Sequence, residues 1–125
     1  MDELQADIAR IVVMARPAFG RTVELILRSA GYEVHRTPDD GILDSLVTRL
    51  RPHLVIIDLN IPWGDAAELA HGLIKRPRPI PLLLLGDAEG DPRLEGVPRV
   101  PLVVDATLLL AAVSGLIATF DSEPD

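Results

Sequence analysis

The segment from His53 to Asp65 reads HLVIIDLNIPWGD and decides the fold class of the chain. Its residues 54–57 are apolar and mostly β-branched, which is typical of a strand buried on both faces of a parallel sheet. The strand ends on a carboxylate, Asp58. A loop with a proline and a glycine follows, and apolar residues at helical spacing then predict a helix from about Asp65 to Lys75. The segment therefore predicts a strand, a loop that opens with an acid, and a helix.

Short apolar runs elsewhere predict four more strands, at residues 10–14, 33–36, 82–85 and 100–104. Helical segments separate most of them and make the crossovers long enough for parallel pairing. The fold class is therefore α/β, a doubly wound five-stranded parallel sheet, with ligands expected at the carboxyl ends of the strands. The stretch from Gly86 to Arg99 carries three glycines and two prolines, so only about one helical turn fits there, around Arg93-Leu94-Glu95.

Three further helices have clear start or stop signals. One follows Pro17 and ends at Gly31, which supplies a left-handed stop. One starts at Thr37-Pro38-Asp39-Asp40, with a hydroxyl cap and a proline in the first position, and runs to Leu50. The last is capped by Asp105 and has an apolar stripe formed by Leu108, Leu109, Ala112, Val113, Leu116, Ile117 and Phe120.

Length and composition favour one globular domain. The chain has 125 residues, 48% of them hydrophobic, which suffices for one packed core but not two. We expect a single domain over residues 1–120 and a polar tail over 121–125 that could begin a linker. No apolar run approaches the roughly 20 residues that cross a bilayer, and the acidic start does not resemble a signal peptide. A cytoplasmic location away from membranes is expected.

Composition also excludes several function classes. The absence of cysteine excludes disulfides, a thiol nucleophile and thiolate zinc sites. A net charge of -7 disfavours nucleic-acid binding. No glycine-rich phosphate loop is present. The histidines are scattered and are interpreted as structural or exposed: His35, His53 and His71. One group of basic residues is either a local basic patch or, as we favour, the solvated ends of helices: Arg49, Arg51, Lys75, Arg76 and Arg78.

The segment from Asp58 to Asp65 resembles the D-x-x-M-P-x-x-D-G motif of the receiver domains of two-component response regulators. The likeness extends over nearly the whole chain. The span from Pro17 to Gly31-Tyr32 is similar to the first helix of that family, and Val104-Asp105 to Val113 is similar to the start of its last helix. The resemblance implies the flavodoxin-like receiver fold, here with a shortened fourth helix.

The resemblance also implies a phosphorylation site of which only part is present. Asp58 stands at the phosphoacceptor position. The other functional positions carry residues without the expected chemistry: Met14 and Ala15 for the magnesium-binding acidic pair, Gly86 for the hydroxyl, Leu102 for the lysine and Arg99 for the switch aromatic. A carboxylate attacks a charged phosphoryl group poorly unless a metal ion and a cation offset the charge. The site therefore resembles a degenerate one, without a metal and without catalytic residues.

Two charged residues close to Asp58 have alternative interpretations. Arg16 lies in the loop where the acids would stand, and we expect it to pair with Asp58 and to supply a fixed positive charge in place of the metal. Asp87, beside Gly86, is interpreted as an ordinary loop acid, or else as an acid that either helps to rebuild a cation site or repels phosphate.

Three function classes follow from these observations. The first, and favoured, is a pseudo-receiver that binds a protein partner, a signalling kinase or another signalling protein, without phosphorylation. The second is a genuine receiver that accepts a phosphoryl group on Asp58, with weakly bound Mg²⁺ assisted by Asn60 or Asp87. The third is an enzyme with its own small substrate. Only the general rule that ligands bind at strand ends supports this class.

The resemblance also suggests where a partner would bind. Receivers use the face formed by the fourth helix, fifth strand and fifth helix, and many form homodimers through it. The shortened segment argues against the usual pairing in this chain. A fixed binding surface that includes Leu94, Val97 and exposed residues of the last helix is expected instead.

Overall fold

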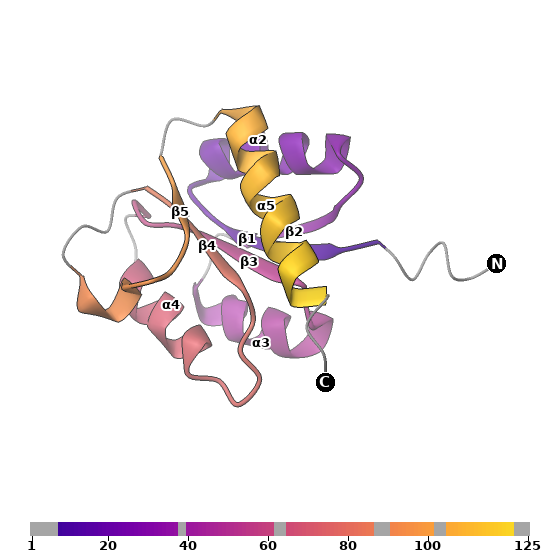
Figure 1. Ribbon diagram of the computed structural model, residues 1–125. Helices are drawn as coiled ribbons and strands as arrows, with labels where there is room; N and C mark the ends of the chain where they lie inside the picture. The colour runs from indigo at the N-terminus through magenta and orange to yellow at the C-terminus, as the bar shows by residue number, and fades with distance from the viewer. Residues whose placement is uncertain (1–7, 38–39, 62–64, 87–90, 102–104, 122–125) are drawn as a thin grey trace.

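A computed structural model describes residues 8–121 except 38–39, 62–64, 87–90 and 102–104 (Figure 1). Strands and helices alternate along the described chain. The elements are β1 (Arg10–Met14), α2 (Pro17–Ser29), β2 (Glu33–Thr37), α3 (Asp40–Leu50), β3 (Leu54–Asp58), α4 (Ala66–Ile74), β4 (Leu82–Leu85), the 3-10 turn η1 (Pro92–Leu94), β5 (Arg99–Val100) and α5 (Ala106–Asp121). None of these helices is both long and apolar enough to cross a bilayer.

The five strands form one parallel sheet in the order β2-β1-β3-β4-β5. This is the flavodoxin-like doubly wound order, in which the chain changes direction between β1 and β3. The fold class predicted from the sequence is therefore confirmed. The register aligns Met14 with Thr37 on one side and with Ile57 on the other, so the carboxyl ends of β1, β2 and β3 lie together at one edge.

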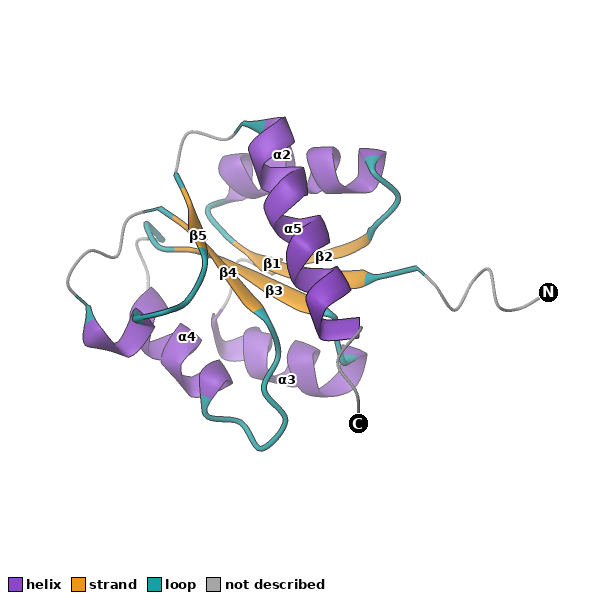
Figure 2. Cartoon of the chain, in the orientation of Figure 1, coloured by secondary structure: helices purple, strands orange, loops and turns teal. Residues whose placement is uncertain are grey.

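Helices cover both faces of the sheet. Helices α2 and α5 lie on one face, and α3 and α4 lie on the other (Figures 1 and 2). Alternate residues of β1 therefore enter two different cores: Ile11 and Val13 pack with α2 and α5, whereas Val12 and Met14 pack with α3 and α4. All of these side chains are fully buried, which explains why the strand sequences are continuously apolar rather than alternating.

Most of the predicted helix ends are confirmed. Gly31 has a φ of 96°, and its backbone N–H and that of Tyr32 donate to carbonyls of the last turn of α2. The carboxylate of Asp65 accepts from the backbone N–H of Glu68, and that of Asp105 accepts from Leu108.

The start of α3 differs from its prediction. Thr37 is the last residue of β2, and α3 begins at Asp40. Residues 38–39 of the predicted cap lie outside the described residues.

Two segments near the carboxyl end of the chain refine the sequence expectations. Strand β5 is described only over Arg99–Val100, because residues 102–104 lie outside the described part. Among the side chains of α5 that are described, which end at residue 118 and so leave out Phe120 of the predicted stripe, Leu109, Val113 and Ile117 are buried. Leu108 is 46% exposed and does not belong to the core as the predicted stripe had it. An apolar stripe predicts which side of a helix is buried, but the docking of the helix decides where the buried part ends.

The region between β4 and β5 is as short as predicted, with η1 as its helical element in the described residues. Leu94 of this turn is only 1% exposed and packs in the core beneath α3 and α4. The expectation that Leu94 belongs to an exposed binding surface is therefore wrong. A short turn rich in glycine and proline needs an apolar anchor, and Leu94 provides it.

Candidate functional site

Asp58 lies at the carboxyl edge of the sheet, at the end of its central strand. It is the last residue of β3, pairs in register with Leu85 of β4, and is fully buried. A buried carboxylate is costly unless its oxygens receive hydrogen bonds, and a buried charge also needs a partner of opposite sign. The surroundings of Asp58 must therefore supply both.

Four donors surround the Asp58 carboxylate. The Arg16 guanidinium donates from Nε to Oδ2 at 2.7 Å and from Nη2 to Oδ1 at 3.4 Å. The backbone N–H of Arg16 donates to Oδ2 at 3.2 Å, and that of Asn60 donates to Oδ1 at 2.9 Å. The pair of Arg16 and Asp58 predicted from the sequence is confirmed. Both oxygens are engaged, one by two donors of Arg16 and the other by Arg16 and Asn60.

The loop after β1 places Arg16 for this contact. Arg16 is the residue before Pro17 and has an extended ψ of 143°, because the proline ring disfavours helical backbone before it. Its guanidinium carbon lies 5.3 Å from the centroid of the Phe19 ring, within reach of a cation–π interaction. Its carbonyl accepts from the Gly20 N–H at 2.7 Å, which joins the loop to the first turn of α2. Arg16 is therefore held on both its side chain and its backbone.

The positions that the resemblance assigns to a magnesium-binding pair cannot hold a hard cation. Met14 is fully buried among the residues that pack with α3 and α4, and Ala15 is buried in the opposite core. Neither side chain carries oxygen, which Mg²⁺ requires. The described residues include no group of three or more His, Asp or Glu side chains that could hold a metal. The described residues around Asp58 therefore do not fit a magnesium ion, and Asp87, the acid of the rebuilt cation site considered from the sequence, lies outside them.

Gly86, at the position of the family's hydroxyl, is fixed by its backbone. Its φ is +117°, a conformation that residues with a Cβ rarely adopt. A Cβ at this position would also lie 3.1 Å from Nδ2 of Asn60. A serine or threonine here would be strained and crowded. The glycine is thus a structural requirement of this turn.

The other predicted site residues are less close to Asp58 or are not described. Arg99 lies in β5, opposite Leu84, and is exposed. Asp87 and Leu102 lie outside the described residues. The contacts that sequence reasoning missed are the aromatic ring of Phe19 and the backbone N–H of Asn60; the sequence signal for the first is an aromatic residue three positions after the arginine.

The η1 turn is joined to α4 by a charged cluster. Arg93 forms ion pairs with Asp91, with Glu68 and with the capping residue Asp65. The Arg93 hydrogen bond lowers the pKa of the Asp91 carboxyl, and Asp91 in turn raises the pKa of Arg93. Val97 is half-buried against the same core. The η1 segment, which stands in place of a full helix, is therefore held by the buried side chain of Leu94 and by the ion pairs of Arg93.

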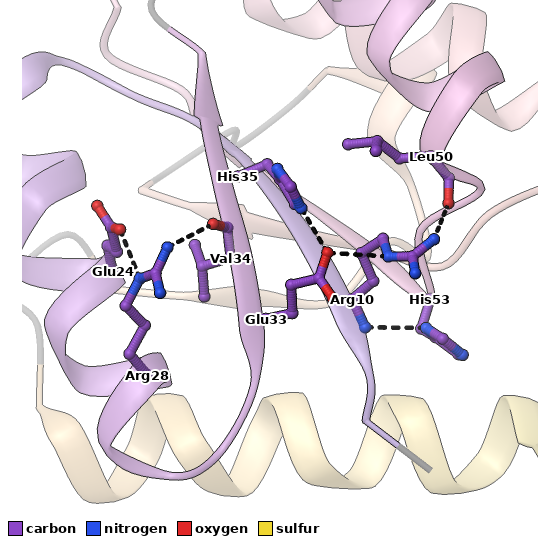
Figure 3. A network of polar contacts seen from close by, with 8 residues as sticks. All are labelled: Arg10, Glu24, Arg28, Glu33, Val34, His35, Leu50 and His53. Carbon is purple, nitrogen blue, oxygen red and sulfur yellow. Dashed lines mark hydrogen bonds and ion pairs between the residues drawn. The ribbon is translucent and has the colours of Figure 1, made fainter. Parts of the chain in front are cut away.

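The opposite, amino edge of the sheet holds a second polar network (Figure 3). Arg10 donates to Glu33 at 3.1 Å and to the Leu50 carbonyl at the end of α3 at 2.6 Å. The Nδ1 atom of His53 accepts from the backbone N–H of Arg10, and His35 contacts Glu33. The interpretation of His35 and His53 as structural residues agrees with these contacts.

Comparison with known proteins supports the fold. No protein-family model matches the chain. The signal receiver domain of a signal transduction histidine kinase from Syntrophus aciditrophicus superposes with a TM-score of 0.80 at 23% identity, over 94% of this chain and 96% of that one.

Two other solved structures give the same result. The BeF3-activated N-terminal receiver domain of RstA from Klebsiella pneumoniae gives a TM-score of 0.74 at 22% identity, over 86% of this chain and 97% of that one. The chemotaxis response regulator CheY4 of Vibrio cholerae gives 0.73 at 20% identity, over 87% of this chain and 98% of that one. The chain has the receiver-domain fold.

Proposed function

We propose that this chain, which has the fold of response-regulator receiver domains, is a pseudo-receiver of two-component signalling that binds a protein partner without being switched by phosphorylation. The observation that carries the proposal is the pair between Arg16 and Asp58. The guanidinium contacts both oxygens of the carboxylate that would have to accept the phosphoryl group.

The chemistry of the site supports a role without phosphoryl transfer. An attacking carboxylate needs a free lone pair directed at phosphorus, and it needs cations that neutralise the charge on the transferred oxygens. In this site the lone pairs of Asp58 are directed at Arg16 and Asn60. A metal cannot be held by Met14 and Ala15, and Arg16 is already engaged with the nucleophile. The proposal assigns no catalytic residue to the chain.

The anchored η1 turn supports a fixed partner surface. In a switching receiver, phosphorylation shifts an equilibrium between two packings of one face. Here the equivalent segment is short and is joined to α4 through Arg93. The partner surface that we propose uses Val97 and the exposed side of α5, where Leu108 is 46% exposed. The partner is a kinase or another signalling protein.

The alternative is a phosphoacceptor role for Asp58, and its position at the end of β3 favours that reading. The two functions differ in one measurable property, since only a phosphoacceptor requires magnesium affinity. Titration with millimolar Mg²⁺ and then with beryllofluoride, a phosphoryl mimic, separates them. Trp63, the single tryptophan and five residues after Asp58, supplies a fluorescence signal.

The expected result is that neither reagent changes the fluorescence or the backbone amide NMR spectrum of folded protein. Asp58→Asn serves as the control, because a real response at the acceptor disappears in this variant. A saturable change that Asp58→Asn abolishes would replace the proposal with the phosphoacceptor function.

A further inference from the structure

Five basic residues that the sequence analysis assigned to solvated helix ends lie at the amino edge of the sheet, away from Asp58. They lie in the last turn of α3 or just after the ends of α3 and α4: Arg49, Arg51, Lys75, Arg76 and Arg78. Cations are favourable at helix C-termini, which accounts for Arg49 and Lys75 as solvated charges. The charge preference at helix ends does not account for Arg51, Arg76 and Arg78, which line one pocket.

The pocket lies between the α3–β3 loop and the segment before β4, and has a volume of about 440 Å³. Three arginines are among the residues that line it: Arg51, Arg76 and Arg78. Its apolar lining includes Val47, Pro52, Pro79 and Ile80, of which Pro79 is exposed and Ile80 is partly exposed, whereas Val47 and Pro52 are buried. No acidic residue is among the described residues that line it. A volume of this size falls within the range of ligand-binding pockets.

The three arginines of the pocket differ in whether they form ion pairs within the protein. Arg76 is fixed, because it donates to Asp44 at 2.6 Å and to the Thr48 hydroxyl at 3.1 Å. Arg51 and Arg78 form no ion pair with any acid in the described part of the chain. The pocket thus combines two arginines without an acidic partner among the described residues and a third, Arg76, whose partner Asp44 is 80% exposed and can be displaced.

We infer that this pocket binds an acidic segment of a partner protein, with carboxylates on Arg51 and Arg78 and an apolar side chain against Pro79 and Ile80. Guanidinium groups bind carboxylates in a bidentate manner, and the apolar lining offers a place for a neighbouring aliphatic side chain. A nucleic acid fits less well, because no aromatic residue lines the pocket for base stacking and the chain has a net charge of -7. The inference that the segment belongs to a partner protein rests on the proposed function.

The test uses the full chain and a short fluorescein-labelled peptide in which glutamate and leucine alternate. Saturable binding by fluorescence anisotropy, weakened by added salt, is expected. The Arg51→Gly and Arg78→Ala variants should each bind about tenfold more weakly, since each loses one charge-assisted interaction. Arg51 has a φ of 50°, so glycine suits its backbone and the variant should remain folded.

Two further variants sharpen the test. Arg21→Ala removes the same charge from α2, on the other face of the sheet, and should leave the affinity unchanged. Asp44→Asn frees Arg76 from its competing carboxylate and should strengthen peptide binding by about threefold. An increase in affinity is the opposite of what loss of the folded pocket would cause.

Several outcomes would overturn the inference. The first is binding that does not saturate at millimolar protein, and the second is a loss of affinity in Arg21→Ala as large as in the pocket variants. The third is equally tight binding of a peptide with serine in place of leucine, or of inorganic phosphate. Either of these last two results would mark a general anion site. Tighter binding of a single-stranded oligonucleotide would assign the pocket to nucleic acid instead. The beryllofluoride titration reads a separate site, so a failure of the pocket and a failure of the proposed function are distinguishable.

Discussion

The two edges of the sheet use arginine in opposite ways. At the carboxyl edge, Arg16 directs its charge onto the fully buried Asp58. At the amino edge, Arg51 and Arg78 surround a pocket without an ion pair to any described acid. The first arrangement stabilises a site that would otherwise be reactive or costly, and the second leaves charge available for a partner. On the inference drawn above, the acidic segment of a partner would bind at the edge opposite to the strand ends where this fold usually places its ligands.

The largest expected effect tests the carboxyl edge. Arg16→Ala should lower the free energy of unfolding by about 2–3 kcal/mol, because a buried carboxylate loses its charged partner and keeps only backbone donors. Urea denaturation measures the change. Arg36→Ala is a matched control: the Arg36 and Arg16 side chains are both 36% exposed, but Arg36 pairs with the partly exposed Glu24. We expect the control to cost less than about 1 kcal/mol. Equal costs for the two variants would contradict the role of burial.

The next effect concerns the turn beside Asp58. Gly86→Ala should destabilise the protein by about 1–2 kcal/mol, because its φ of +117° is unfavourable for any residue with a Cβ. Gly72→Ala, in the exposed interior of α4 where a Cβ meets nothing within 4 Å, should instead stabilise by about 0.5–1 kcal/mol. Thermal unfolding of the two variants gives opposite shifts in Tm. A neutral Gly86→Ala would mean that alanine, or a serine, fits this position.

A smaller effect is expected at the amino edge. Arg51→Gly should leave stability unchanged or raise it by up to about 1 kcal/mol, because the positive φ is relieved and no ion pair is lost. Chemical denaturation of this variant and of Arg16→Ala compares the change in unfolding free energy at the two edges of the sheet. A loss as large as that of Arg16→Ala would show that Arg51 has a structural role and is not free for a ligand.

The smallest effect is a dependence on pH. The His35 hydrogen bond, with Arg10, holds the pKa of the Glu33 carboxyl below its ordinary value of 4.5. Glu33 therefore contributes stability that is present above the unfolded pKa and is lost as the pH falls through the folded pKa. Glu33→Gln should flatten the profile of unfolding free energy against pH below about pH 4.5, as measured by urea denaturation at a series of pH values. A profile that Glu33→Gln does not alter would contradict this assignment.

Much of the site followed from position along the chain. The ends of β1 and β3 were expected at the same edge of a parallel sheet, so Arg16 could be predicted to meet Asp58 before any distance was known. The caps at Asp65 and Asp105 followed equally directly, because capping depends on residues three positions apart. These predictions involve local chemistry, or a topology with few alternatives.

Predictions that depended on how elements dock were less successful. Leu94 was expected at the surface and is buried, and Leu108 was expected in the core and is half exposed. Both are leucines in short or amphipathic segments whose composition allows either outcome. Only the packing of η1 against α4 and of α5 against the sheet selects one.

By itself, the sequence determined the order of the elements, the parallel sheet and the pairing of Asp58 with Arg16, because strand periodicity, caps and crossover rules act locally or leave few choices. The tertiary structure decided why Gly86 cannot be a hydroxyl residue, since that depends on the backbone angle and on Asn60 nearby. It also brought Arg51, Arg76 and Arg78, from two separate loops, to one pocket. Distances between loops far apart in the chain follow from how the helices pack on the sheet, and no single segment encodes them.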